Sequence, residues 1–136
     1  MKSRNSFLSE RQIEVLKLRR QGLIQRQVAD RLKTTRENVS ILESRAHRNI
    51  ERAIATLEIL EEQGISTHIT IMPKKHILEV PKIILREADK ATIKINSSLI
   101  EILELVKLRA RSKIVNKHIV KPISVTILPD GKLTVE

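Results

Sequence analysis

Apolar residues recur every three or four positions through the first half of the chain, which is the spacing of one face of an α-helix. The pattern predicts a first helix that begins at Ser9 and stops at Gly22, and Gln12 stands at the capping-box distance from Ser9. A short second helix is predicted over 25–32. After a break of three residues, a third helix is predicted over 36–63, because no Pro or Gly interrupts that segment.

The third helix is unusually long. A continuous helix over 36–63 would measure roughly 42 Å at 1.5 Å per residue. A compact helical head does not need that length, so its second half is expected to pack on the C-terminal half of the chain or on a second copy of the protein. A break between His47 and Asn49 is the alternative.

Beyond Gly64 the pattern changes to short segments typical of mixed α and β structure. Strands are predicted over 67–71, 77–80, 91–95, 123–127 and 133–135. Helices are predicted over 82–90, after Pro81, and from Leu99 to about Lys113.

The segment from Gln25 to Arg45 is the most informative part of the sequence. A short helix, a three-residue break and a second helix that opens at Arg36 must cross steeply, which is the arrangement of a helix-turn-helix. Its predicted internal contacts join Val28, Ala29 and Leu32 on the first helix to Val39, Leu42 and Ala46 on the second. In such motifs the early residues of the second helix enter the major groove of duplex DNA.

The expected fold class is an N-terminal all-α helix-turn-helix head with a long following helix, joined to a small C-terminal α+β domain. The boundary is placed between Gln63 and Gly64, because glycine commonly ends a helix. The expected domains are therefore 1–63, a helix-turn-helix DNA-binding domain with an extended helix, and 64–136, an α+β domain for dimerisation or effector binding.

Polar side chains fill the start of the second helix of the motif. Arg36 has the geometry to fork onto guanine or to hold a phosphate, and Asn38 to pair with adenine. Glu37 can accept from cytosine, or it can only offset the helix dipole and orient Arg36. The predicted DNA-binding residues are Arg36, Glu37, Asn38, Ser40, Ile41, Ser44, Arg45, Arg26, Lys33 and Arg48.

Two further roles are assigned to charged residues of the head. Basic side chains on its surface are expected to contact phosphates, which would make binding fall steeply with salt. The candidates are Arg4, Arg11, Lys17, Arg19, Arg20, Arg26, Arg31, Lys33, Arg48 and Arg52. Glu43 and Arg45 can alternatively form a surface ion pair with each other.

The charge supports a polyanionic partner. The net charge is +10 and the isoelectric point about 10.3, which favours nucleic acid first and an anionic membrane surface second. Residues 1–52 hold thirteen Lys or Arg against six Asp or Glu, a net of +7. The chain has one Phe and neither Tyr nor Trp, so stacking on single-stranded bases is a poor mechanism for it.

Enzymatic and metal chemistry find little support in the sequence. Cysteine is absent, which excludes disulfides, thiolate metal sites and a cysteine nucleophile. The four histidines lack metal-ligand spacing, three glycines make no phosphate loop, and no Ser/His/Asp constellation is recognisable. We therefore expect a protein that is not an enzyme, with no catalytic residues, no metal and no cofactor.

The sequence also bears on location. No apolar run approaches the ~20 residues of a membrane span, and no signal-peptide pattern follows the N-terminus. We expect a cytoplasmic protein that makes no contact with a membrane.

A run of six bases without an acid extends from Lys107 to Lys121. It is either a solvated helix end whose bases offset the helix dipole, a set of added phosphate contacts, or a pocket for a small anionic effector.

Residues 27–46 resemble the region-4 helix-turn-helix of bacterial sigma factors and the heads of related response regulators. The likeness is carried by Val28-Ala29-Asp30-Arg31-Leu32, Thr35-Arg36-Glu37, Val39, Glu43 and Arg45-Ala46. Residues 8–16 are similar to the opening helix of those heads.

Over most of 6–136 the chain resembles the archaeal Tfx family of DNA-binding proteins. The C-terminal likeness is carried by Val80-Pro81, Ala88-Asp89-Lys90-Ala91, Ile93-Lys94-Ile95-Asn96 and Asp130-Gly131. The resemblance implies a transcriptional regulator. Ser40-Ile41 stands where the sigma-type pattern usually has Arg-Gln, so no base preference is implied. Lys33 stands where Gly is common, and because a non-Gly residue at positive φ costs about 1 kcal/mol, another turn conformation is the alternative.

The expected function is therefore that of a sequence-specific regulator that binds double-stranded promoter DNA with a recognition helix starting at Arg36. The alternatives are a sigma-like or adaptor protein that contacts RNA polymerase, and an RNA-binding protein. Helix-turn-helix regulators normally bind two half-sites as dimers. We expect a homodimer, formed through the helix from Ile50 to Leu60 or through an edge strand, and a small anionic effector is a possible further partner.

Overall fold

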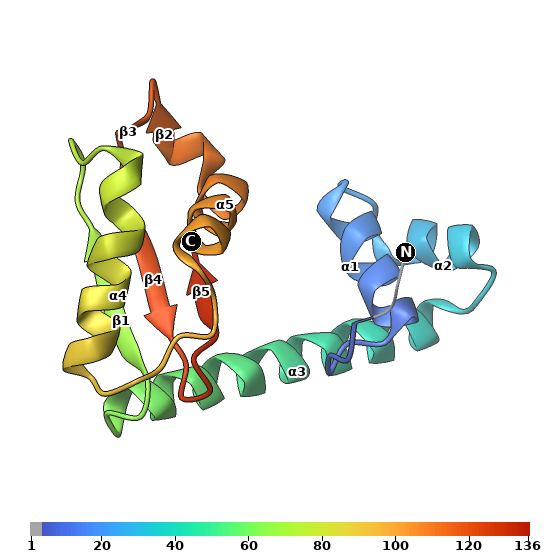
Figure 1. The fold of residues 1–136 in the computed structure, drawn as a ribbon. Helices are drawn as coiled ribbons and strands as arrows, with labels where there is room; N and C mark the ends of the chain where they lie inside the picture. Colours follow the sequence, from blue (N-terminus) through green and yellow to red (C-terminus); the bar gives the residue numbers. More distant parts are fainter. Residues whose placement is uncertain (1–3) are drawn as a thin grey trace. The chain divides into compact units, whose positions relative to one another are not determined.

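The computed structural model describes residues 4–136 (Figure 1). Contacts divide the chain into two compact units, Met1–Glu58 and Ile59–Glu136. The N-terminal unit is all-α and the C-terminal unit is α+β, so the predicted fold class is confirmed. The division lies within helix α3 (Arg36–Glu62), and the domain boundary between Gln63 and Gly64 stays a prediction.

The three predicted helices of the N-terminal unit are present. They are α1 (Glu10–Arg20), α2 (Gln25–Leu32) and α3 (Arg36–Glu62). The hydroxyl of Ser9 accepts from the backbone N–H of Gln12 at 3.1 Å, and the Gln12 side chain accepts from the N–H of Ser9 at 3.1 Å, so the predicted capping box forms. Helix α3 is continuous, and the alternative break between His47 and Asn49 does not occur.

Two of these helices end in the same way. Gly22 has φ +96°, and its neighbour Leu23 donates to the carbonyl of Leu18 at 3.2 Å, which is the Schellman arrangement. Lys33 ends α2 with φ 55° and ψ 49°. The alternative of another turn conformation at Lys33 is therefore wrong, and the lysine adopts the left-handed geometry that usually favours glycine.

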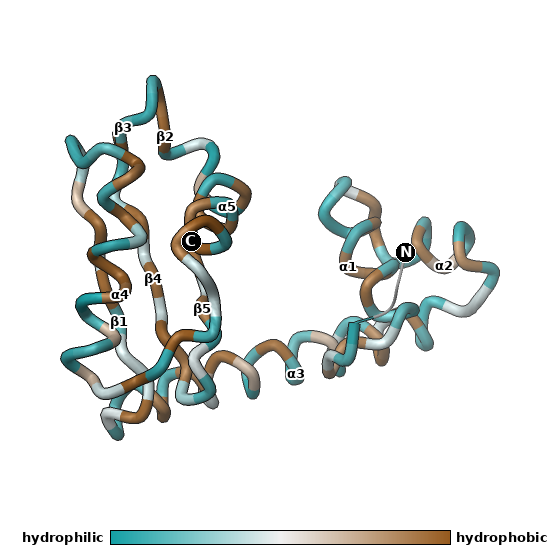
Figure 2. The backbone as a smooth tube through the Cα atoms, viewed as in Figure 1, coloured by the Kyte–Doolittle hydropathy of each residue, from teal (hydrophilic) through white to brown (hydrophobic). Residues whose placement is uncertain are grey.

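The core of the head contains most of the residues predicted to join the two helices of the motif; Ala46 is also buried, but it lies outside the cluster. Val15, Val28, Ala29 and Val39 are buried in one cluster. Half-buried leucines pack against this cluster from all three helices and from the α1–α2 loop: Leu18, Leu23, Leu32 and Leu42. Figure 2 shows hydrophobic and hydrophilic positions alternating along α3, as expected for an amphipathic helix.

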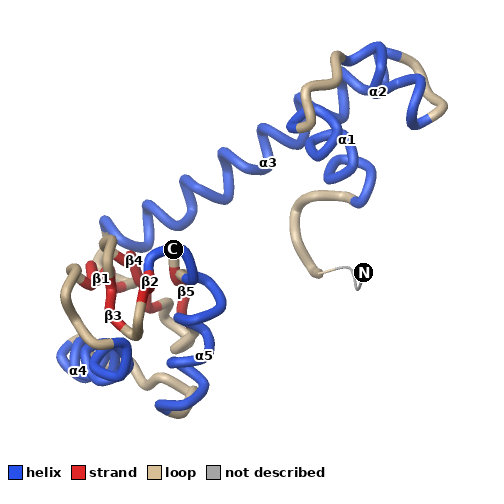
Figure 3. The backbone as a smooth tube through the Cα atoms, turned by 90° about the horizontal axis from the view of Figure 1, so that it is seen from above, coloured by secondary structure: helices blue, strands red, loops and turns tan. Residues whose placement is uncertain are grey.

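The C-terminal unit is built on an antiparallel sheet in the order β1-β4-β5. The strands are β1 (Thr67–Ile71), β4 (Ile123–Ile127) and β5 (Leu133–Val135), each of them at its predicted position. Helices α4 (Val80–Lys90) and α5 (Leu99–Arg109) cover one face of this sheet (Figure 3). Alternate residues of β4 are buried against them, because successive side chains of a strand point to opposite faces.

The predicted strand over 77–80 is wrong. This segment is a 3-10 turn, Ile77–Glu79, that leads directly into α4. The ring Nδ1 of His76 accepts from the N–H of Leu78 at 3.1 Å, and the Glu79 carboxylate accepts from the N–H of His76 at 2.9 Å. These two side chains accept hydrogen bonds from backbone N–H groups that a helix start leaves free. The apolar composition of the segment alone does not indicate this capping.

The predicted strand over 91–95 is also wrong. Thr92 has φ 59°, and Ile93 donates to the carbonyl of Ala88 at 2.9 Å, so the segment closes the end of α4. Its alternating isoleucines, Ile93 and Ile95, still pack against the core, but from a loop.

The helix predicted from Leu99 to about Lys113 ends earlier than expected, and a small hairpin that was not predicted follows it. Helix α5 ends at Arg109, and a 3-10 turn, Arg111–Lys113, leads to β2 (Ile114–Val115) and β3 (His118–Ile119). Asn116 and Lys117 both have positive φ, 50° and 64°, as a type I′ hairpin turn requires. In residues 4–136, no helix is long and apolar enough to cross a membrane.

Candidate functional site

The turn between α2 and α3 is held by backbone and threonine hydrogen bonds. Thr34 donates its N–H to the carbonyl of Ala29 at 2.9 Å, which fixes the left-handed residue before it. Thr35 caps α3, because its hydroxyl accepts from the N–H of Asn38 at 3.1 Å. The start of α3 is thus rigidly defined relative to the end of α2, as a recognition helix requires.

One face of α3 gathers five of the ten predicted DNA-binding residues. They line a single shallow hollow of about 380 Å³: Ser40, Ile41, Ser44, Arg45 and Arg48. All five are exposed, and the apolar residue Ile41 is 48% exposed. The hollow therefore combines hydroxyls, an apolar contact and two guanidinium groups on adjacent helical turns.

The first turn of α3 presents Arg36, Glu37 and Asn38 to solvent. The amide Nδ2 of Asn38 donates to the hydroxyl of Thr34 at 3.0 Å. The amide carries two N–H donors, so this hydrogen bond orients the side chain and leaves one N–H and the amide oxygen for pairing with adenine. Sequence spacing did not indicate the contact with Thr34.

Arg26 and Lys33 lie outside the hollow. Arg26 is exposed in the first turn of α2, and Lys33 is exposed in the turn before α3. Neither side chain makes an ion pair within residues 4–136. Lys33 is thus available to a polyanion next to the start of α3, whereas Arg26 lies at the opposite end of α2.

The predicted alternative of an ion pair between Glu43 and Arg45 is wrong. Glu43 instead accepts from Nε of Arg19 on α1, at 2.7 Å. Arg19 also donates Nη1 to the carbonyl of Leu23 at 2.9 Å. Arg19, a candidate phosphate contact, is therefore engaged in holding α1, its following loop and α3 together, whereas Arg45 has no ion pair within residues 4–136.

The C-terminal unit brings two histidines together that lie far apart in sequence. The rings of His76 and His118 meet edge to face with centroids 5.1 Å apart. Within the described part of the chain, no group of three His, Cys, Asp or Glu side chains is arranged to hold a metal ion. The histidine contact follows from the pairing of the 74–77 loop with the β2–β3 hairpin, which no local sequence signal indicated.

The head is a helix-turn-helix whose second helix, α3, is exposed and basic, and a small α+β unit follows it. These features define the class of two-part helix-turn-helix proteins, and comparison with known proteins identifies the family. Residues 53–135 match the family model described as the C-terminal part of the DNA-binding protein Tfx. A Methanocaldococcus jannaschii protein, provisionally named a transcriptional regulatory protein, is 37% identical over 131 residues, 96% of each chain. The DNA-binding protein Tfx of Methanothermobacter thermautotrophicus is 31% identical over 134 residues, 98% of this chain and 97% of that protein. The chain belongs to the Tfx family.

Proposed function

We propose that this protein is a sequence-specific, double-stranded DNA-binding transcriptional regulator that reads the major groove with the first turns of α3. The observation that carries the proposal is the exposed face containing Ser40, Ile41, Ser44, Arg45 and Arg48. Its side chains supply hydrogen-bond donors, acceptors and a methyl-bearing contact, which are the groups that read base edges. The names of the relatives agree with DNA binding and regulation.

The remaining predicted residues extend this surface. Arg36 and Glu37 lie at the leading edge of α3, and Arg26 and Lys33 flank it on α2 and the turn. We assign base contacts to the first turns of α3 and phosphate contacts to Arg48 and the flanking cations, because phosphate contacts position a head and base contacts specify the sequence.

The test is selection of binding sites from random duplex DNA, followed by fluorescence anisotropy on the selected site. Arg45→Ala is expected to weaken binding by about 5- to 150-fold, since a good bidentate or charge-assisted contact contributes about 1–3 kcal/mol. Arg86→Ala is the matched control, because Arg86 is an exposed residue of α4 in the C-terminal unit. This variant should bind the duplex as tightly as the parent.

The outcomes also separate the alternatives. A sigma-like or adaptor protein would yield no enriched duplex without RNA polymerase. An RNA-binding protein would release the duplex to structured RNA at equal concentration. Either result, or equal binding by Arg45→Ala and the parent, contradicts the proposal.

We further propose a homodimer through the N-terminal unit. Asn49 on α3 donates Nδ2 to the carbonyl of Phe7 at 2.9 Å, so the N-terminal arm lies along the helix. The arm and α3 together leave Phe7, Ile54 and Leu57 exposed, by 75%, 51% and 49%. An apolar patch of this kind in a helix-turn-helix protein is suited to pairing two copies.

The basic run from Lys107 to Lys121 is the basis for an effector role. It spans the end of α5, the following 3-10 turn and the β2–β3 hairpin. We propose that the C-terminal unit binds a small anionic effector there, and the chemistry of that ligand is argued next.

A further inference from the structure

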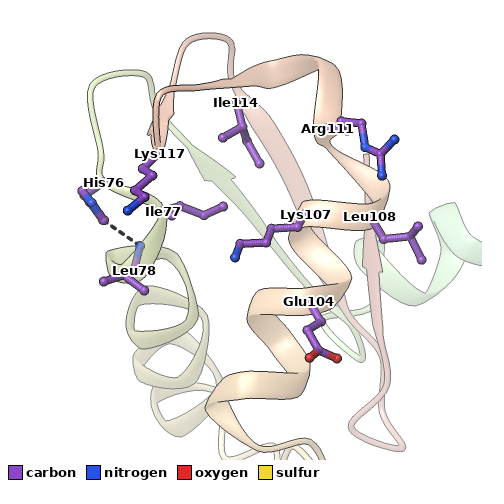
Figure 4. Close-up of a pocket in the computed structure, with 9 residues that line it drawn as sticks. All are labelled: His76, Ile77, Leu78, Glu104, Lys107, Leu108, Arg111, Ile114 and Lys117. Atoms are coloured by element: carbon purple, nitrogen blue, oxygen red, sulfur yellow. Dashed lines mark hydrogen bonds between the residues drawn. The ribbon is translucent and has the colours of Figure 1, made fainter.

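The C-terminal unit contains an open pocket between α5 and the β2–β3 hairpin (Figure 4). Its volume is about 720 Å³, within the range of small-molecule sites. One wall is the 76–78 segment before α4, a second is the last turns of α5, and the third is the hairpin. All of its lining residues belong to one compact unit.

Backbone hydrogen bonds fix two of these walls to each other. Ile77 donates its N–H to the carbonyl of Lys117 at 2.8 Å, and Ile119 donates to the carbonyl of Lys75 at 2.9 Å. The left-handed turn at Asn116 and Lys117 sets the direction of the hairpin. The pocket is therefore formed before any ligand arrives, which lowers the entropic cost of binding.

The inside of the pocket is apolar. Ile77 is buried at its base, and Ile114 is half-buried above it. Leu78 and Leu108 lie on its rim and are 59% and 67% exposed. Ile77 and Ile114 thus supply the apolar surface of a space that no side chain of the described residues fills, and Leu78 and Leu108 extend that surface at its exposed edge.

Cations surround this apolar interior. Lys107, Arg111 and Lys117 line the pocket against one carboxylate, Glu104. None of the four makes an ion pair within residues 4–136. In Figure 4 the amino groups of Lys107 and Lys117 approach the pocket from different walls, with Ile77 between them, and the Glu104 carboxylate lies at the lower edge.

Helix electrostatics account for only part of this charge. Bases in the last turn of α5 offset the negative end of the helix dipole, which covers Lys107 and Arg109. Lys117 belongs to the hairpin, so the dipole does not explain why it faces the same space. A set of phosphate contacts for DNA would explain the cations but leaves the apolar surface of Ile77 and Ile114 without a role.

We propose that this pocket binds a small organic acid, in which one carboxylate is joined to an apolar body. The carboxylate lies between Lys107 and Lys117, and the body packs on Ile77 and Ile114. Charge-assisted hydrogen bonds hold the anion, and burial of the apolar body supplies the remaining affinity. The proposal extends the proposed role of a regulator with an effector, but ligand binding itself does not depend on DNA binding.

The test is titration of the full chain with octanoate, followed by isothermal calorimetry and by amide NMR shifts. Octanoate is expected to bind with shifts at 76–78, 104–111 and 114–117. Two probes lack one half of the chemistry: 1-octanol has no charge, and inorganic phosphate has no apolar body. Both should bind at least tenfold more weakly than octanoate, because each loses one of the two contributions.

Substitutions locate the site. The double variant Lys107→Gln, Lys117→Gln is expected to weaken octanoate binding about tenfold or more. The double variant Lys82→Gln, Lys94→Gln removes the same charge from exposed positions of the same unit outside the pocket and the basic run, and should bind within about twofold of the parent. Circular dichroism confirms that each variant is folded.

Several results overturn the proposal. They are no octanoate binding, binding that 1-octanol matches, shifts confined to the N-terminal unit, or an equal loss in both double variants. Anisotropy on the selected duplex is recorded separately with and without octanoate. If the chain binds octanoate but no duplex, the regulator proposal alone is contradicted. If the chain binds duplex but no octanoate, the pocket proposal alone is contradicted.

Discussion

Arg19 and Glu43 join the first and third helices of the head. The Nε of Arg19 lies 2.7 Å from the Glu43 carboxylate, and the two side chains are 39% and 15% exposed. Because Arg19 also donates to the carbonyl of Leu23 at 2.9 Å, a single guanidinium holds the end of α1, the following loop and the middle of α3. Helix α3 is thus held to α1 as well as to the turn that begins it.

Removing this brace should lower the stability of the head. Glu43→Gln is expected to reduce the free energy of unfolding by about 0.5–1 kcal/mol, a value kept small because Arg19 is partly exposed and water screens the pair. Urea denaturation followed by circular dichroism measures it. A double-mutant cycle with Arg19→Met should return most of that loss as coupling. Arg45→Gln, two residues away and unpaired in the described structure, is the control; an equal loss in this variant would show that the pair is not the cause.

A second prediction concerns Lys33, which holds φ 55° at the turn. Lys33→Gly is expected to raise the free energy of unfolding by about 0.5–1 kcal/mol, because glycine relieves the left-handed strain. The same change should weaken duplex binding, since it removes a cation beside α3. Gly22→Ala is the opposite test, because Gly22 has φ +96° and open space around it. Only backbone strain is added there, so the free energy of unfolding should fall by about 1 kcal/mol. Loss of stability in Lys33→Gly would contradict the strain argument.

The head was largely predictable from sequence. The spacing of apolar residues along a helix fixes which side faces the core. Val28, Ala29 and Val39 were therefore placed together correctly. The side-chain partners on its surface were not predictable. Glu43 pairs with Arg19, 24 residues away, and not with its near neighbour Arg45. The reason is that helix packing brings α1 beside α3, which the local spacing of charged residues does not indicate.

The C-terminal unit was predicted less well where short apolar segments were involved. A histidine ring caps the turn before α4, and Thr92 takes a left-handed conformation after it, so two segments with strand-like composition do not form strands. The pocket was also hidden in the sequence. An anionic ligand was one of three interpretations of the basic run, and the apolar surface beside it is assembled from Ile77 and Ile114, which lie on separate segments.

Gly131 supplies a third prediction. An added Cβ there would lie 2.2 Å from the carbonyl oxygen of Lys94, in a backbone with φ +86°. Gly131→Ala should therefore destabilise the C-terminal unit by about 2–4 kcal/mol, combining strain with a clash against the backbone. Gly64→Ala is the matched control, with φ +69° and nothing within 4 Å, and should cost only about 1 kcal/mol. Thermal unfolding of both variants measures the difference. Equal melting temperatures would show that the backbone at Lys94 moves away from the added Cβ at no cost in stability.

The fourth prediction is the salt dependence of duplex binding. If Arg48 contacts a phosphate, Arg48→Ala should lower the slope of log K against log salt by about 1 and weaken binding to all sequences alike. Asn38→Ala should instead relax the preference at one base pair and leave the slope unchanged, once the hydrogen bond to Thr34 is discounted by a Thr34→Val background. Anisotropy titrations at four salt concentrations distinguish the two. A slope that Arg48→Ala does not change would remove Arg48 from the phosphate set.

The last prediction concerns the homodimer. Leu57 is 49% exposed beside Phe7 and Ile54, so Leu57→Lys places a charge in the proposed interface and should convert the protein to a monomer at micromolar concentration. Sedimentation equilibrium measures the mass. Ile100→Lys is the matched control, because Ile100 is 68% exposed on α5 in the other unit and the same charge is added there. The parent and Ile100→Lys should both sediment as dimers. A monomeric parent would end the dimer proposal, and a dimeric Leu57→Lys with a monomeric Ile100→Lys would move the interface to the C-terminal unit.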